Sequence, residues 1–109
     1  MRQLLRFYLL LEQGKLVSPA ASQTMREIFA SPAIAHREDK FVKGLAGRGV
    51  ELLRKAGWWE TWAHDTAIVA GPGRHYILVA LTHHLQGDAT LAELAAAVDD
   101  ELGGALPAR

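Results

Sequence analysis

Side chains that could carry hydrolytic chemistry occur at only a few places in this sequence. Ser31, His36 and Asp39 supply the three residue types of a serine-hydrolase triad in one short stretch, but a triad is defined by geometry rather than by closeness along the chain. The simpler interpretation of residues 36–40 is a solvated, charged loop. His64 and Asp65 resemble a base and its orienting carboxylate, yet neighbours in a strand point to opposite faces. We therefore expect Asp65 to cap or bridge at the start of its strand.

Metal chemistry has little support in the sequence. His75, His83 and His84 lie near one another along the chain, but no two histidines have the His-x-x-x-His spacing of a helical zinc site. The chain has no cysteine, which excludes disulfides, thiolate metal sites and a cysteine nucleophile. We predict neither a metal nor a cofactor.

A lysine and a glycine stand close together before a cluster of aromatic residues. The triplet is Lys55-Ala56-Gly57, followed by Trp58, Trp59 and Trp62. A lysine at the end of a strand is ordinarily a solvated charge that discourages edge-to-edge aggregation, so the triplet alone is a weak indicator of a cleft. The tryptophans could line a pocket, although such clusters more often pack a loop onto a sheet.

Helices are predicted on both sides of this region. Residues 2–13 are apolar around nearly the whole helical circumference, which predicts a helix buried on most sides by further protein, before Gly14 ends it. Ser18 and Pro19 have the residue types of an N-cap and a first helical position. Residues 90–93 have the pattern of a capping box and begin a helix over 90–102.

The middle of the chain predicts antiparallel strands over 50–55, 64–70 and 75–82. The last two flank the turn sequence Gly71-Pro72-Gly73-Arg74, which is typical of a hairpin. Both faces of the third strand are apolar, so we expect both to be covered by helices. The fold class is thus α/β of the α+β type: a helical segment 1–49, antiparallel strands over 50–82 and a C-terminal helix, together one partial domain, 1–109.

Composition removes several classes of function. Half of the 109 residues are hydrophobic and the formal net charge is zero. The chain can therefore form a core, and it lacks the basic excess of a nucleic-acid-binding domain. No apolar run approaches the ~20 residues that span a bilayer, and the start lacks a signal-peptide pattern. We predict neither a nucleic-acid nor a membrane partner, and the compartment stays open.

Four segments in order resemble the carboxy-terminal part of class A β-lactamase-like serine hydrolases. They are Lys40–Leu45, Leu53–Trp58, His64–Val69 and Tyr76–Leu81. The catalytic content of the resemblance lies in Lys55-Ala56-Gly57, which is similar to the family's Lys-[Ser/Thr]-Gly motif. The resemblance implies an antiparallel sheet with the last helix on one face and an all-α lobe beside it. It also implies a protein that works outside the cytoplasm.

The resemblance implies a role for each residue of the motif. Lys55 would border the active-site cleft and attract a substrate carboxylate. Gly57 would let the strand backbone approach the ligand, and the N–H of Trp58 would stand at the oxyanion-hole position. Ala56 departs from the family because it has no hydroxyl, which removes a hydrogen bond worth about 1.5–3 kcal/mol.

The family's other motifs are absent from these 109 residues. No lysine follows a serine by three positions, and the sequence has no asparagine, so Ser-x-x-Lys and Ser-x-Asn are both lacking. We therefore expect a carboxy-terminal portion, inactive alone, whose nucleophile comes from a missing N-terminal portion or a complementing chain. The alternative is a non-catalytic module that uses its exposed sheet face for homo-oligomerisation or for binding another protein.

Overall fold

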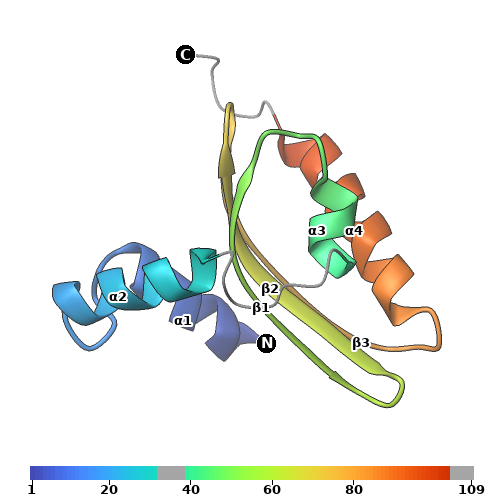
Figure 1. The fold of residues 1–109 in the computed structure, drawn as a ribbon, viewed down its shortest axis with the longest axis horizontal. Coiled ribbons are helices and arrows are strands. Elements are labelled where there is room, and N and C mark those ends of the chain that lie inside the picture. The colour runs from blue at the N-terminus through green and yellow to red at the C-terminus, as the bar shows by residue number, and fades with distance from the viewer. Residues whose placement is uncertain (32–38, 104–109) are drawn as a thin grey trace.

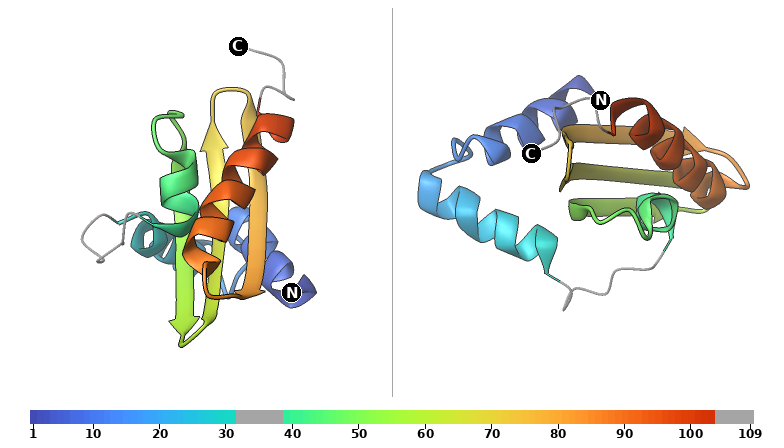
Figure 2. Two further views of the ribbon diagram at one scale, coloured as in Figure 1. Left: turned by 90° about the vertical axis from the view of Figure 1, so that its right-hand side faces the viewer. Right: turned by 90° about the horizontal axis from the view of Figure 1, so that it is seen from above.

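The computed structural model describes residues 1–31 and 39–103 and shows an α+β fold (Figure 1). Four helices and a three-stranded sheet follow in the order α1 (Arg2–Glu12), α2 (Pro19–Ala30), α3 (Lys40–Leu45), β1 (Glu51–Trp59), β2 (Trp62–Gly71), β3 (Arg74–His83) and α4 (Gly87–Leu102). Helices α1 and α2 lie on one side of the sheet, and α3 and α4 lie on the other (Figure 2). The predicted fold class is confirmed.

The sheet is antiparallel throughout, with the strand order β1-β2-β3. The second turn, Pro72-Gly73, joins Gly71 to Arg74 as predicted, and Gly73 takes the positive φ of 74° that such a turn requires. The first strand was predicted to end at Lys55 but continues to Trp59. It does so because the tryptophan-rich segment pairs with β2 as far as Trp59 and Trp62 instead of forming a loop, and aromatic residues favour strands.

The face of the sheet under α3 and α4 holds the larger core. Buried residues of both helices pack there against buried residues of β2 and β3: Phe41, Leu45, Ala63, Ala67, Val69, Ala80, Leu91 and Ala95. The two helices touch at Gly44, where an added Cβ would lie 2.0 Å from the carbonyl oxygen of Ala92. Only glycine permits this approach of backbone to backbone.

The opposite face packs against α1 and α2. Tyr8 and Leu11 of α1 contact Leu53 and Ile68 in a second buried cluster, to which α2 adds Met25 and Phe29 at its margin. The helix ends follow the sequence signals: Ser18 Oγ accepts a hydrogen bond from the N–H of Ala21 at 3.0 Å, and Gly14 has a φ of 71°. The predicted N-cap at Ser18 and the predicted helix stop at Gly14 are both confirmed.

Helix α1 is less buried by this chain than its composition predicts. Only Tyr8 and Leu11 are buried, whereas Met1, Leu4, Leu5 and Leu9 remain 37–61% exposed. The described residues leave this side of α1 uncovered because α2 and the sheet contact only the other side. No helix within the described ranges is long and apolar enough to cross a membrane.

Helix α4 begins at Gly87 rather than at the predicted residue 90, and the predicted capping box is wrong. The Thr90 hydroxyl donates instead to the Gln86 carbonyl one turn earlier. The helix extends to Gly87 because this residue is buried against the sheet, where an added Cβ would lie 2.8 Å from the Ala63 Cβ. This contact between distant segments has no local sequence signal.

Candidate functional site

The Lys-Ala-Gly triplet lies inside β1, at the edge of the sheet. Lys55, Ala56 and Gly57 pair with Thr66, Asp65 and His64 of β2. The Lys55 side chain is exposed, and its Nζ donates a hydrogen bond to the Ala56 carbonyl at 2.6 Å. The sequence had suggested that Lys55 ends its strand. The triplet instead lies within the part of β1 that is paired with β2.

The register decides which backbone groups of β1 face outwards. Residues that flank a two-residue turn exchange backbone hydrogen bonds, and such pairs recur at every second position. Since Trp59 and Trp62 flank the first turn, Gly57 and Lys55 share the orientation of Trp59. The amides of Ala56 and Trp58 consequently point to the outer edge of the sheet, away from β2.

A buried ion pair holds β1 in this position from the α3/α4 face. Arg54 donates from Nε to Asp65 Oδ1 at 3.1 Å and from a terminal nitrogen to Oδ2 at 2.8 Å. The same carboxylate accepts the N–H of Phe41 at 3.1 Å, near the start of α3, and the N–H of Thr66 at 2.9 Å. Asp65 thus bridges to Arg54 and caps the start of α3, as expected, although it lies inside β2 rather than at the start of that strand.

A second hydrogen-bonded chain supports the triplet from the α1/α2 face. The Thr66 hydroxyl donates to the carbonyl of Lys55 at 2.8 Å, so the Tyr8 hydroxyl, 2.5 Å from Thr66 Oγ1, is the donor to it. Burial raises the pKa of the Tyr8 hydroxyl above its usual value, which keeps this donor protonated. Helix α1 therefore fixes the strand that carries Lys55.

Gly57 has no steric role within the described part of the chain. A Cβ added at this residue would have no neighbouring heavy atom within 4 Å, and its φ lies outside the range that favours glycine. Gly44 and Gly87 differ because their own neighbours exclude a Cβ. Glycine at position 57 leaves open a part of the strand surface that no other described residue covers.

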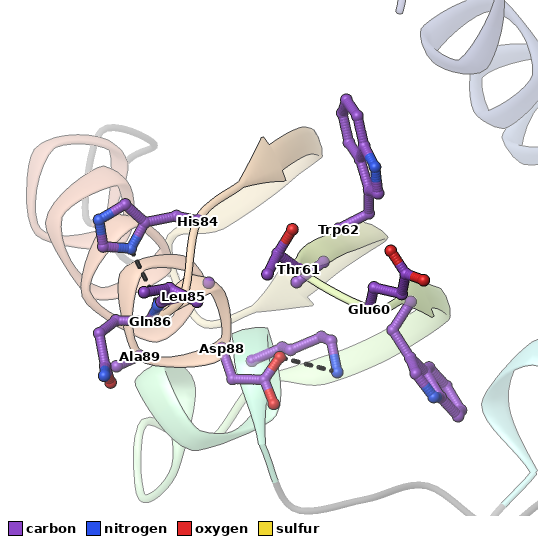
Figure 3. Close-up of a pocket in the computed structure, with 12 residues that line it drawn as sticks. Glu60, Thr61, Trp62, His84, Leu85, Gln86, Asp88 and Ala89 are labelled. Carbon is purple, nitrogen blue, oxygen red and sulfur yellow. Dashed lines mark hydrogen bonds and ion pairs between the residues drawn. The ribbon is translucent and has the colours of Figure 1, made fainter.

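A pocket near the triplet lies around the tip of the β1–β2 hairpin (Figure 3). It has a volume of about 300 Å³, and its lining includes Trp58, Trp62, Lys40 and Asp88. Of the predicted site residues only Trp58 reaches it; Lys55, Ala56 and Gly57 do not line it. Trp58 and Trp62 are among the residues that line this pocket, whereas Trp59 is not and is 71% exposed.

Sequence reasoning missed Lys40. Its side chain is 2% exposed, its backbone has a positive φ of 52°, and its Nζ lies 5.2 Å from the centre of the Trp58 ring. Nζ also lies 3.1 Å from Asp88 Oδ1 and 3.6 Å from Asp39 Oδ2. No local pattern marks a buried lysine of this kind, because two of its partners, Trp58 and Asp88, come from β1 and α4.

The other candidate residues are dispersed. His36 of the conceivable triad lies outside the described residues. His64 Nδ1 accepts the N–H of Thr82 at 3.1 Å, and His83 stacks on Trp62 with the ring centres 4.0 Å apart. Within residues 1–31 and 39–103, no group of three or more histidines and carboxylates could hold a metal ion.

Comparison with known proteins identifies the family. No curated protein and no solved structure matches the chain. The family model described as the β-lactamase enzyme family matches residues 1–102, which include the edge strand with Lys55, the hairpins and helix α4. The chain belongs to the β-lactamase enzyme family.

Proposed function

We propose that this chain forms one wall of the acyl-transfer site of a β-lactamase-like serine hydrolase. The observation that carries the proposal is the outer edge of β1, where an exposed ammonium, an unobstructed glycine and an outward amide follow one another at positions 55, 57 and 58. Membership of the family supports the reaction class. The attacking hydroxyl comes from polypeptide outside this sequence.

Each group has a distinct task in this proposal. The Lys55 ammonium attracts the carboxylate of the substrate, and Gly57 lets the acyl group approach the strand. The N–H of Trp58 donates to the carbonyl oxygen as it gains negative charge in the tetrahedral intermediate. The two hydrogen-bonded supports, Arg54–Asp65 and Tyr8–Thr66, hold this edge in place without contacting substrate.

In this proposal the chain is not acylated by itself. The sequence contains neither Ser-x-x-Lys nor Ser-x-Asn, so it has no activated serine of the family type. Ala56 lacks the hydroxyl that would hold the substrate carboxylate. We therefore propose that the chain binds the substrate weakly and that bond cleavage needs the complementing segment.

The test uses the chain alone with two probes. A fluorescent penicillin should leave it unlabelled, and unlabelled benzylpenicillin should reversibly shift the NMR amide signals of Ala56 and Trp58. Ala56→Thr should tighten this binding by about tenfold or more, because it restores a hydrogen bond to a charged group. Lys55→Gln should abolish the shifts, whereas Lys15→Gln, at another exposed lysine, should not.

Covalent labelling of this chain would refute the proposal, as would shifts that survive Lys55→Gln unchanged. The second outcome would favour the other candidate, a non-catalytic interaction module. The exposed hydrophobic side chains Leu9, Trp59 and Leu81 support that candidate, since large bare apolar surfaces commonly bind partners.

A further inference from the structure

An aromatic surface lies on the face of the sheet that α1 and α2 cover in part. Trp59 of β1, Trp62 of β2 and His83 of β3 are partners across the three strands, so their side chains share one face. Trp59 and Trp62 each lie six positions from Leu53 and Ile68, which pack against α1. Because side chains alternate between faces at every residue, the aromatic side chains are on the α1/α2 face as well.

The rings on this face are close together, and the two indoles are largely uncovered. The Trp62 ring stacks on the His83 ring, with the centres 4.0 Å apart and the planes 8° apart, and its centre lies 6.0 Å from that of His64. Trp62 is nevertheless 46% exposed, and Trp59 is 71% exposed. The described residues therefore leave much of both indoles available for contact with another molecule.

The same face carries the side chain of Lys55. Lys55 and Gly57 lie four and two positions before Trp59 in β1, so all three residues face the same way. Gly57 has no side chain, and consequently nothing from β1 stands on this face between the ammonium and the indole. At a rise of about 3.4 Å per residue, the Cα atoms of Lys55 and Trp59 are about 13 Å apart. One small molecule can contact both side chains.

The order of the groups along β1 determines which part of a substrate reaches the indoles. In the proposed acyl-transfer site, the substrate carboxylate lies at Lys55 and the acyl carbonyl oxygen lies at the N–H of Trp58. The substrate then runs along β1 towards the hairpin turn, and the substituent of its acyl group continues towards Trp59 and Trp62. These indoles carry no charge, so they favour an apolar substituent, and a flat ring can stack on them.

We propose that this site selects substrates whose acyl group carries an aromatic substituent, and that this substituent packs against the indoles of Trp59 and Trp62. The inference rests on the proposed function, since it places the substrate carboxylate at Lys55. Trp59 and Trp62 are specificity-determining residues in this proposal, and they take no part in bond cleavage.

The test is an NMR titration of the chain with two penicillins that share the bicyclic nucleus and the carboxylate. One is benzylpenicillin, and the other has an acetyl side chain in place of the phenylacetyl side chain. Benzylpenicillin should bind about fivefold more tightly or more, because its ring adds an aromatic contact. Only benzylpenicillin should shift the indole N–H signals of Trp59 and Trp62.

A pair of variants at exposed apolar positions tests the role of the indole. Trp59→Leu should bring the ratio of the two affinities close to one, because it removes the ring and keeps an apolar side chain. Leu94→Ala, at an exposed residue of α4 on the other side of the sheet, should leave the ratio unchanged. Lys55→Gln should weaken the binding of both penicillins alike.

The outcomes separate this inference from the proposed function. Equal affinities for the two penicillins, both lost in Lys55→Gln, would overturn the aromatic preference and leave the acyl-transfer wall in place. A preference that persists unchanged in Trp59→Leu would overturn it as well. Binding that persists in Lys55→Gln would refute the proposed function, and this inference with it.

Discussion

Asp65 is the residue through which three elements of the fold are connected. Its carboxylate pairs with Arg54 on β1, accepts the N–H of Phe41 in α3, and lies on β2 itself. Both members of the ion pair are nearly inaccessible, at 0% and 4% exposure. A buried ion pair stabilises a fold little relative to apolar residues in the same place. The loss of one partner, however, leaves the other charge buried without a counter-charge.

Replacement of this carboxylate by an amide should therefore be costly. We expect Asp65→Asn to lower the free energy of unfolding by about 3–5 kcal/mol, because Arg54 would stay buried without its counter-charge. Urea unfolding followed by circular dichroism measures the change. Asp100→Asn removes a carboxylate that is paired with Arg48 but mostly exposed, and should cost less than about 1 kcal/mol. Similar losses in both variants would contradict this account.

Two glycines of the chain differ in the space around them. Gly44 lies where α3 crosses α4, and a Cβ there would collide with the backbone of Ala92. Gly57 lies on β1, and a Cβ there would meet no heavy atom within 4 Å. The first glycine is required by the packing of this chain, whereas no contact among the described residues requires the second.

A matched pair of alanine variants tests this difference. Gly44→Ala should destabilise the chain by about 1–3 kcal/mol, since the helices must move apart. Gly57→Ala should keep or slightly raise the stability, by up to about 1 kcal/mol, because alanine restricts the unfolded chain. Thermal unfolding compares the two variants. Gly57→Ala should nevertheless weaken the penicillin-induced amide shifts; if it left them unchanged, position 57 would not lie against the ligand.

At the scale of the whole molecule, the two faces of the sheet are covered unequally. Helices α3 and α4 bury one face with a continuous core, while α1 and α2 bury part of the other (Figure 2). The outer side of α1 presents Leu4, Leu5 and Leu9, each at least 37% exposed. Such an apolar stripe favours association with another polypeptide or with a second copy of the chain.

This stripe should make the isolated chain self-associate. We expect its mass, measured by size-exclusion chromatography with light scattering, to rise with concentration. The double variant Leu5→Lys and Leu9→Lys should remain a monomer, because charged side chains at exposed positions remove the apolar contact without disturbing the core. Lysine at the exposed residues Gln23 and Thr24 of α2 is the control. A wild-type chain that stays monomeric at all concentrations would show that α1 is not an association surface.

Much of the fold follows from local patterns. The turn at Pro72-Gly73, the cap at Ser18 and the glycine stop at Gly14 were all predictable because each depends on the conformation of a few adjacent residues. The end of β1 and the start of α4 were not. Both depend on pairing or packing with distant residues, Trp62 in one case and Ala63 in the other.

The candidate site divides in the same way. The sequence by itself determined the Lys-x-Gly triplet, the lack of a hydroxyl at Ala56 and the lack of a family-type nucleophile, because these are facts of residue type and spacing. Only the tertiary structure decided that the amide of Trp58 points outwards, that Asp65 supports the edge strand and that Lys40 meets Trp58 and Asp88 in a pocket. These outcomes depend on strand register and on contacts between segments far apart in the chain, and no local pattern of residues encodes them.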